Sequence, residues 1–273
     1  MSSEGLIEGT RKPRLLCLHG FRTSGRILET QLQKWPQFVL DKLDLFFPDA
    51  PYPAVGKSHV DGLFDPPYYE WLSSKKEFVY TKFDETIKYI EDSMIKHRPI
   101  DGLLGFSQGS VLSAALAGLQ AKGLALTKVP KLKFLIIISG AKLRNEAWVD
   151  KAFSDIIRCP SLHFLGELDY LKSQGTELLE SFVDPVVIHH REGHTVPSLD
   201  TTIIALETPG THYFISAEPG HCTNGMKFAI DDSVKGETSP QRRHVNCNDC
   251  PLAPPDVNCV LAVAVLLLAI LLL

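Results

Sequence analysis

Short apolar runs alternate with stretches of helical spacing over residues 1–200 of the chain. The apolar runs are predicted strands at residues 14–18, 43–47, 100–105, 133–139, 161–166 and 185–190. The stretches between them predict helices at residues 81–98, 109–120, 145–153 and 173–182. This alternation is typical of βαβ units, so it predicts an α/β fold with a mostly parallel sheet and flanking helices.

Composition narrows the classes of function. The chain has 273 residues, of which 44% are hydrophobic and 22% are charged, so it can bury a core without disulfides or a metal. Its net charge of -4 leaves no basic surplus to neutralise phosphates, which argues against nucleic-acid binding. We therefore expect a site for a small molecule.

The pentapeptide Gly105-Phe106-Ser107-Gln108-Gly109 matches the pattern G-x-S-x-G. It lies between a predicted strand and a predicted helix, which is the context that this pattern needs. A nucleophile on a sharp turn requires glycine on both sides so that strand and helix can approach each other. We therefore predict that Ser107 is a catalytic nucleophile.

An activated serine needs a base, and the base needs a carboxylate that orients it. In α/β-hydrolases these residues follow in the order Ser, Asp or Glu, His, and this chain offers Asp169 and His194 just beyond two predicted strands. Carboxyl ends of parallel strands meet at one edge of a sheet, so the three residues would converge there. Glu167 is the main alternative to Asp169, and His189 and His190 are weaker alternatives to His194.

The tetrahedral intermediate needs donors for its oxyanion. We predict the backbone N–H groups of Gln108 and Phe21, because Gln108 follows the nucleophile and Phe21 follows the first strand. An excursion at residues 51–76 breaks the strand–helix rhythm and is rich in proline and aromatic residues. It is expected to be ordered and to form a substrate pocket wall, although its aromatic residues could equally pack the core. The residues concerned are Phe64, Tyr68, Tyr69 and Trp71.

Four ordered motifs resemble the FSH family of serine hydrolases, which includes the esterases named for an ovarian tumour suppressor candidate and has plant members. The motifs are L-C-L-H-G-F-R at residues 16–22, D-P-P-Y-Y-E-W at 65–71, G-F-S-Q-G at 105–109 and G-H-T-V-P at 193–197. The resemblance covers about residues 12–199. It implies an α/β-hydrolase-like domain that cleaves carboxylic esters or thioesters, with Ser107, Asp169 and His194 as its triad. The implied partner is a small-molecule ester or thioester.

The chain changes character after residue 200. Residues 201–206, 211–216 and 226–231 predict short antiparallel strands, residues 233–258 a polar and disordered linker, and residues 259–273 an apolar tail. Segments at residues 208–214 and 219–227 resemble the last strands of a phytocyanin, a plant cupredoxin. We therefore predict a hydrolase domain at residues 1–200, a partial phytocyanin-like segment at 201–232, the linker and the tail.

No metal or cofactor is expected. A blue-copper site needs two His and one Cys with a weak axial Met, and the phytocyanin resemblance supplies only His221 and Met226. Ser216 stands at the position of the thiolate, and the segment that would carry the other His is absent. Cys247 and Cys250 have C-x-x-C spacing, but no second pair follows at the spacing of metal ligands.

The two ends of the sequence point to different compartments. Residues 1–14 lack the apolar run of a secretory signal, which predicts a cytoplasmic protein, with the nucleus as an alternative. The tail at Cys259 to Leu273 is wholly apolar and suits membrane association or the removable tail of a GPI signal. The alternative function is thus a membrane-anchored, electron-transfer-type phytocyanin-like fusion with an impaired hydrolase portion.

Overall fold

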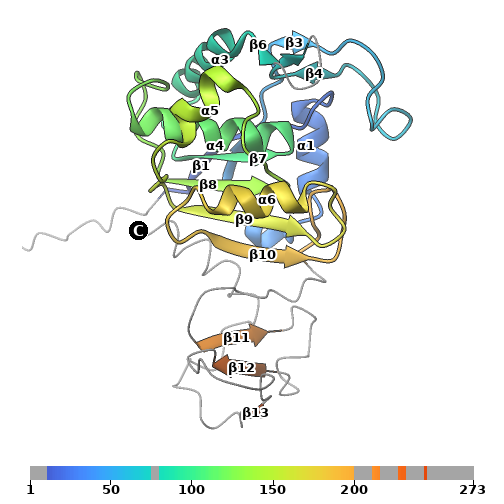
Figure 1. The fold of residues 1–273 in the computed structure, drawn as a ribbon. Coiled ribbons are helices and arrows are strands. Elements are labelled where there is room, and N and C mark those ends of the chain that lie inside the picture. Colours follow the sequence, from blue (N-terminus) through green and yellow to red (C-terminus); the bar gives the residue numbers. More distant parts are fainter. Residues whose placement is uncertain (1–10, 75–79, 200–210, 216–226, 232–242, 245–273) are drawn as a thin grey trace, which may run out of the picture.

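The main sheet has six strands, all parallel, in the order β10-β9-β8-β7-β1-β2. The computed structural model of the protein describes residues 11–74, 80–199, 211–215, 227–231 and 243–244. The strands are β1 (Arg14–Leu18), β2 (Asp44–Phe46), β7 (Gly102–Phe106), β8 (Phe134–Ile138), β9 (Ser161–Gly166) and β10 (Val186–His190). Each apolar run thus forms one strand, and the predicted α/β fold is confirmed (Figure 1).

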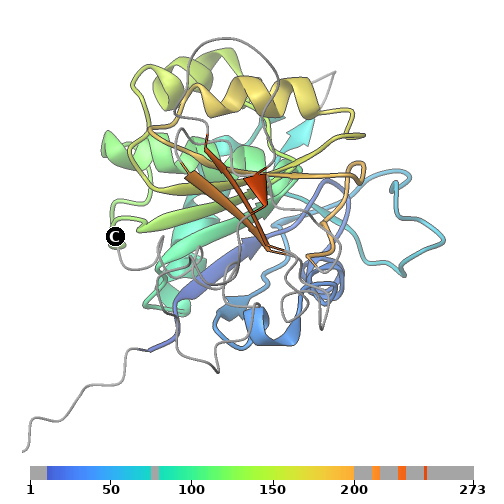
Figure 2. The same cartoon turned by 90° about the horizontal axis from the view of Figure 1, so that it is seen from below.

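Helices cover both faces of this sheet. Within the described ranges they are α1 (Gly25–Leu32), α2 (Gln37–Leu40), α3 (Phe83–Lys96), α4 (Gln108–Ala121), α5 (Glu146–Phe153) and α6 (Lys172–Leu179). Figure 2 shows α4 and α6 on one side of the sheet and α1 on the other. The sequence predicted α3 to α6, whereas α1 and α2 were not predicted.

Two apolar layers make up the core, one on each face of the sheet. Successive side chains of a strand point to opposite faces, so Leu103 of β7 packs with α3 to α6 while Leu104 packs with α1 and α2. The central strands β7 and β8 are buried along their whole length. A strand buried on both faces reads as a continuous apolar run, which explains why the sequence identified these strands.

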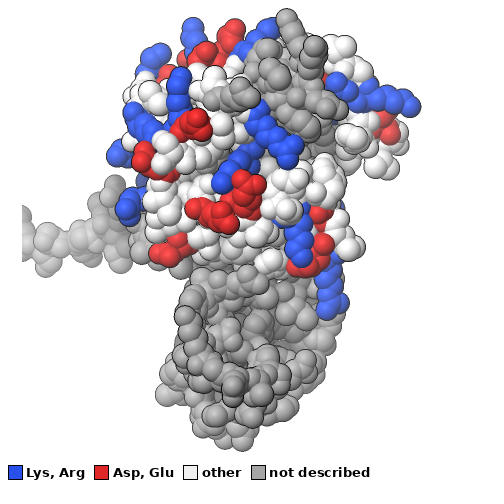
Figure 3. Space-filling model, viewed as in Figure 1, with Lys and Arg blue, Asp and Glu red and all other residues white. Residues whose placement is uncertain are grey.

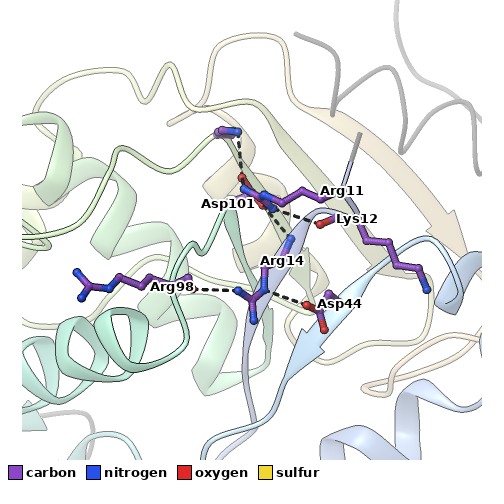
Figure 4. Close-up of polar contacts among 7 residues, drawn as sticks. Arg11, Lys12, Arg14, Asp44, Arg98 and Asp101 are labelled. Carbon is purple, nitrogen blue, oxygen red and sulfur yellow. Dashed lines mark hydrogen bonds and ion pairs between the residues drawn. The ribbon is translucent and has the colours of Figure 1, made fainter. Parts of the chain in front are cut away.

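Charged side chains hold the amino ends of the strands together, at the edge opposite to Ser107 (Figure 4). Asp101 accepts hydrogen bonds from Arg11 at 2.5 and 2.8 Å and from the backbone N–H of Arg14 at 2.9 Å, and it pairs with Lys133 at 3.0 Å. Burial alone would raise the pKa of Asp101, but these contacts outweigh it and lower the pKa to about 2. The ionised carboxylate therefore joins the segments that enter β1, β7 and β8.

The excursion at residues 51–76 contains short antiparallel pairs. The strand β3 (Tyr52–Pro53) pairs with β4 (Tyr69–Glu70), and β5 (Ser73–Ser74) pairs with β6 (Tyr80–Thr81). The pair β3–β4 joins the two ends of the segment between them, and β5–β6 links the end of the excursion to the residues that lead into α3. Figure 1 shows the excursion beside the carboxyl edge of the main sheet.

A separate three-stranded sheet follows the main domain in sequence. Its strands β11 (Thr211–Ile215), β12 (Lys227–Asp231) and β13 (Arg243–His244) pair in antiparallel fashion. The first two match predicted strands, whereas β13 falls in the segment predicted to be disordered. The predicted strand at residues 201–206 and the tail at 259–273 lie outside the described residues. Among the residues described, no helix is long and apolar enough to cross a membrane.

Basic and acidic side chains are interspersed on the face drawn in Figure 3. Lysine–carboxylate pairs of the described residues include Lys142–Glu177 at 3.4 Å and Lys172–Glu167 at 2.5 Å. Such pairs contribute little to stability when exposed. Their mixing on this face agrees with the small net charge of the chain.

The buried histidine of β9 should make stability depend on pH. His163 is 1% exposed, and burial lowers its pKa to about 3. Below about pH 6.5 the unfolded chain binds a proton that the folded protein excludes. As the pH drops from about 6.5 toward 3, the contribution of His163 should therefore lower the free energy of unfolding by about 1.4 kcal/mol per pH unit. Denaturant titrations across this range measure the slope.

The variant His163→Leu isolates the contribution of His163 to this pH dependence, because leucine fills a similar volume but has no group that binds a proton. It should flatten the pH dependence, although His19, with a pKa lowered to about 4 by burial, keeps part of it. The exposed His59 provides a comparison variant, and His59→Leu should unfold within about 0.5 kcal/mol of the wild type at neutral pH. An unaltered slope in His163→Leu would show that other groups control the acid sensitivity.

Candidate active site

Ser107 occupies a strained turn between β7 and α4. Its φ of 54° and ψ of -115° lie in a region that non-glycine residues rarely adopt. A Cβ on Gly105 would lie 2.5 Å from the carbonyl carbon of Gly109, and a Cβ on Gly109 would lie 1.9 Å from the carbonyl oxygen of Leu18. Glycine is therefore required on both sides of the serine for strand and helix to pack this closely.

Hydrogen bonds join the three predicted triad residues. The Nε2 atom of His194 is 2.8 Å from Oγ of Ser107, and its Nδ1 atom is 2.9 and 3.1 Å from the two oxygens of Asp169. Asp169 follows β9 and His194 follows β10, so both reach Ser107 at the carboxyl edge of the sheet. With Nδ1 donating to the carboxylate, Nε2 is free to accept the hydroxyl proton of Ser107.

The carboxylate of Asp169 is buried and ionised. Burial would raise its pKa, but contacts with the side chains of His194 and Ser139 and the backbone N–H of Leu171 outweigh burial and lower the pKa. The Leu171 N–H donates to Oδ1 at 2.8 Å. Ser139 directly follows β8, has a φ of 53° and is 2% exposed. The sequence analysis did not single out Ser139, although its place after an apolar strand puts it at the same edge.

The alternative acid and bases make other contacts. Glu167 pairs with Lys172 at 2.5 Å and with His189 at 3.0 Å, on the surface of the sheet edge. Its pKa is lowered mainly by the hydrogen bond from Lys172. His190 is 2% exposed, and burial lowers its pKa. The hydroxyl of Ser107 instead lies 2.8 Å from Nε2 of His194.

The loop after β1 lies beside Ser107. His19 is fully buried, and its Nε2 atom accepts a hydrogen bond from the backbone N–H of Ala50 at 3.0 Å, while Nδ1 lies 2.8 Å from the carbonyl oxygen of Gly20. Burial lowers the pKa of His19 to about 4, so the ring is neutral and holds the loop in place. Phe21 follows this turn. Gln108 opens α4, so its N–H has no partner inside the helix.

The excursion braces this loop through Trp71. The indole N–H of Trp71 donates to the carbonyl oxygen of His19 at 2.9 Å, and its backbone N–H donates to Oε1 of Gln108 at 2.9 Å. Trp71 has no exposed surface, so the structure places it in the core instead of on an open pocket wall. Tyr69 packs against the same core, and its backbone N–H donates to the carbonyl oxygen of Thr23 at 2.7 Å.

The other two predicted pocket residues are half-buried. The hydroxyl of Tyr68 donates to the carbonyl oxygen of Phe64 at 2.5 Å, within the excursion. Arg22 ties the loop and the excursion together, because its Nε donates to the buried carboxylate of Glu70 at 2.8 Å. The excursion therefore positions the loop that carries Phe21, a role that the sequence analysis did not predict.

Substitution of Trp71 by phenylalanine should destabilise this loop. The carbonyl oxygen of His19 would stay buried without its donor, which costs about 1–3 kcal/mol in the free energy of unfolding. We expect a lower kcat as well, because the loop beside Ser107 loses its brace. Urea denaturation and ester hydrolysis measure the two effects. The half-buried Trp148, which packs on Phe83 with ring centroids 5.0 Å apart, gives the control Trp148→Phe, whose kcat should stay unchanged.

Cysteines and metal ligands lie apart from this site. Cys17 is a buried free thiol and Cys159 a half-buried one, and burial raises both pKa values, that of Cys159 to about 12. Over the described ranges, no group of three or more His, Cys, Asp or Glu residues could hold a metal ion. The segments with the remaining four cysteines, and with His221, Met226 and Ser216, lie outside the described residues.

Two family profiles match the sequence. That of the serine hydrolase (FSH1) family matches residues 9–206, and that of a plastocyanin-like domain matches residues 188–226. The first match spans the six parallel strands and all three residues of the hydrogen-bonded triad. The second overlaps it at β10 and extends through β11.

Curated relatives carry esterase and serine hydrolase names. An esterase of Anopheles gambiae is 28% identical over 201 residues, covering 70% of this chain and 74% of that protein. Family of serine hydrolases 3 of Saccharomyces cerevisiae is 30% identical over 217 residues, covering 69% of this chain and 80% of that protein. Esterase OVCA2 of Bos taurus is 25% identical over 205 residues, covering 68% of this chain and 89% of that protein.

Solved structures include acyl-protein thioesterase 2 of Zea mays, which is 20% identical, has a TM-score of 0.46 and covers 70% of this chain and 90% of its own. The family assignment rests on the profile, which covers more than half of the sequence and includes the G-x-S-x-G turn. The chain belongs to the FSH1 family of serine hydrolases.

Proposed function

We propose that the protein hydrolyses carboxylic esters or thioesters through an acyl-enzyme intermediate on Ser107. One observation carries this proposal, namely the continuous hydrogen-bond chain from Oγ of Ser107 through His194 to Asp169. A serine hydroxyl becomes a useful nucleophile when a base receives its proton and a carboxylate orients that base. The esterase names of the relatives support the same reaction class.

In the first half-reaction, Oγ of Ser107 attacks the acyl carbon while Nε2 of His194 takes the hydroxyl proton. Asp169 stabilises the resulting imidazolium through Nδ1. We propose that the backbone N–H groups of Phe21 and Gln108 donate to the oxyanion. Collapse of the tetrahedral intermediate breaks the bond to the leaving oxygen or sulfur, which receives the proton from Nε2.

In the second half-reaction, water attacks the acyl-enzyme. His194 takes a proton from that water, and a second tetrahedral intermediate forms. Its collapse breaks the bond between the acyl carbon and Oγ of Ser107, Oγ receives the proton from His194, and the carboxylic acid leaves. Phe64, Tyr68 and Tyr69 on the excursion are proposed to line the acyl side of the site. The apolar character of these rings suits an acyl chain.

A common acyl-enzyme can be tested by partitioning. An ester and a thioester with the same butyryl group are hydrolysed in the presence of hydroxylamine, and the ratio of butyryl hydroxamate to butyrate is measured for each. A shared intermediate has lost its leaving group, so both substrates should give the same ratio. After subtraction of the hydroxamate formed without enzyme, ratios that differ between the substrates would exclude a common acyl-enzyme and would contradict the proposed mechanism.

The segment after residue 200 is proposed to be an incomplete phytocyanin-like module without a copper site. The plastocyanin-like match and the antiparallel pairing of β11 with β12 support the likeness. The ligand set inferred from the sequence lacks the thiolate and one imidazole. The cytoplasmic compartment and the membrane-anchored alternative both stay predictions, since the tail at residues 259–273 lies outside the described residues.

A further inference from the structure

An exposed aromatic ring packs on the proposed base. The ring of Tyr170 has its centroid 4.4 Å from that of His194, with 36° between the planes, and Tyr170 is 71% exposed. Phe106 also contacts the imidazole, at 5.2 Å, but is only 6% exposed. The imidazole therefore has one buried aromatic neighbour and one that is exposed to solvent.

The exposure of Tyr170 leaves part of its ring available to a ligand. A tyrosine ring offers a flat apolar surface that can pack on an aromatic group of a substrate. Tyr170 directly follows Asp169 on the loop after β9, so its backbone is fixed by the contacts that hold the carboxylate. Its ring is thus presented in a defined position beside the reacting atoms.

The proposed reaction places the leaving group next to this ring. Nε2 of His194 must come within about 2.6–3.2 Å of the leaving oxygen in order to protonate it. The substituent on that oxygen then lies near the imidazole, on which the ring of Tyr170 packs. Aromatic rings attract one another at centroid distances of about 4.5–7 Å, which a substituent one or two bonds from the leaving oxygen can reach.

We propose that Tyr170 is a specificity-determining residue that favours esters with a planar aromatic group in the alcohol part. The inference rests on the proposed function and adds the leaving-group side of the substrate. The acyl side is assigned to a different segment, the excursion, so the two specificities can be measured independently.

A matched pair of esters tests this proposal. Benzyl butyrate and cyclohexylmethyl butyrate share the acyl group, and their alcohols have the same number of carbons and similar acidity, so they differ mainly in aromaticity. The measured quantity is the ratio of kcat/KM for the benzyl ester to that for the cyclohexylmethyl ester. In Tyr170→Leu this ratio should fall by about 2- to 10-fold relative to the wild type, because leucine keeps the apolar contact but cannot stack.

Two further variants separate stacking from other effects. Tyr170→Phe keeps the ring and should retain the wild-type ratio. Leu168 lies on the same loop and is 78% exposed, so Leu168→Ala removes a comparably exposed apolar side chain without touching the ring contact and should also retain the ratio. If Tyr170 only positioned His194, both esters would slow equally in Tyr170→Leu, and the unchanged ratio would overturn the inference.

Failure of the inference can be distinguished from failure of the proposed function. Suppose that the wild type reacts with a fluorophosphonate at Ser107 but has the same benzyl to cyclohexylmethyl ratio of kcat/KM as Tyr170→Leu. This result contradicts the role of Tyr170 alone. The same holds if the labelled wild type hydrolyses neither ester. A folded wild type that neither hydrolyses the esters nor reacts at Ser107 contradicts both.

Discussion

Replacement of Ser107 by alanine is expected to lower kcat/KM for ester hydrolysis by a factor of about 10⁴ to 10⁶, the range found when a triad nucleophile is removed. Alanine lacks the Oγ atom that lies 2.8 Å from Nε2 of His194, so no acyl-enzyme can form. The backbone conformation demands the same strain of alanine as of serine. The variant should therefore fold like the wild type, and circular dichroism together with steady-state hydrolysis of p-nitrophenyl butyrate measures both properties.

Ser113, in the helix α4 that follows Ser107, offers a matched control. It is fully buried in α4, and its hydroxyl donates to the carbonyl oxygen of Gly109 at 2.8 Å, without contact to His194. Ser113→Ala deletes the same atom type and should keep kcat/KM within about twofold of the wild type, since it removes no group that we assign to the reaction. Retention of more than a tenth of the wild-type activity by Ser107→Ala would assign the nucleophile elsewhere.

Substitution of Gly109 by alanine should have the largest effect on stability. The added Cβ would lie 1.9 Å from the carbonyl oxygen of Leu18 and 2.5 Å from its carbonyl carbon. Both atoms belong to the backbone of β1, which is paired with β7 and β2 and cannot rotate away as a side chain could. We expect a loss of more than about 4 kcal/mol in the free energy of unfolding, at the upper end for single substitutions.

Gly193 provides the control for this experiment. A Cβ there would meet the carbonyl oxygen of Leu168 at 3.4 Å, an ordinary contact distance. Gly193→Ala should therefore shift the midpoint of thermal unfolding only slightly, whereas Gly109→Ala should unfold at a much lower temperature or fail to accumulate as soluble protein. Equal stability of the two variants would show that α4 can move away from β1 without cost.

The sequence was sufficient to predict the strands and helices whose apolar residues form a clear pattern. Strands β7 and β8 are continuous apolar runs because both faces are buried, and α4 follows the glycine-flanked serine. The helix α1 was missed because it is short and begins at a glycine, although Ser24 caps it by accepting a hydrogen bond from Ile27 N–H. A serine before an apolar pair was the available signal.

Residues of the site could be predicted only where a short sequence pattern marks them. Ser107, Asp169 and His194 each follow a strand, and chain order suggested their roles. The brace from Trp71 to His19 joins residues 52 positions apart, so no local pattern could reveal it. The same holds for the ring of Tyr170, whose contact with His194 depends on how two loops fold toward each other.

Labelling with a fluorophosphonate tests the central claim, the activation of Ser107 by His194, most directly. Oγ of Ser107 attacks phosphorus, fluoride leaves, and the modified peptide is located by mass spectrometry. The full-length wild type should be labelled at Ser107, Ser107→Ala should not be labelled, and His194→Gln should react far more slowly. A folded wild type that stays unlabelled, or one modified at another residue, would contradict the assignment of this hydrogen-bonded triad as the catalytic machinery.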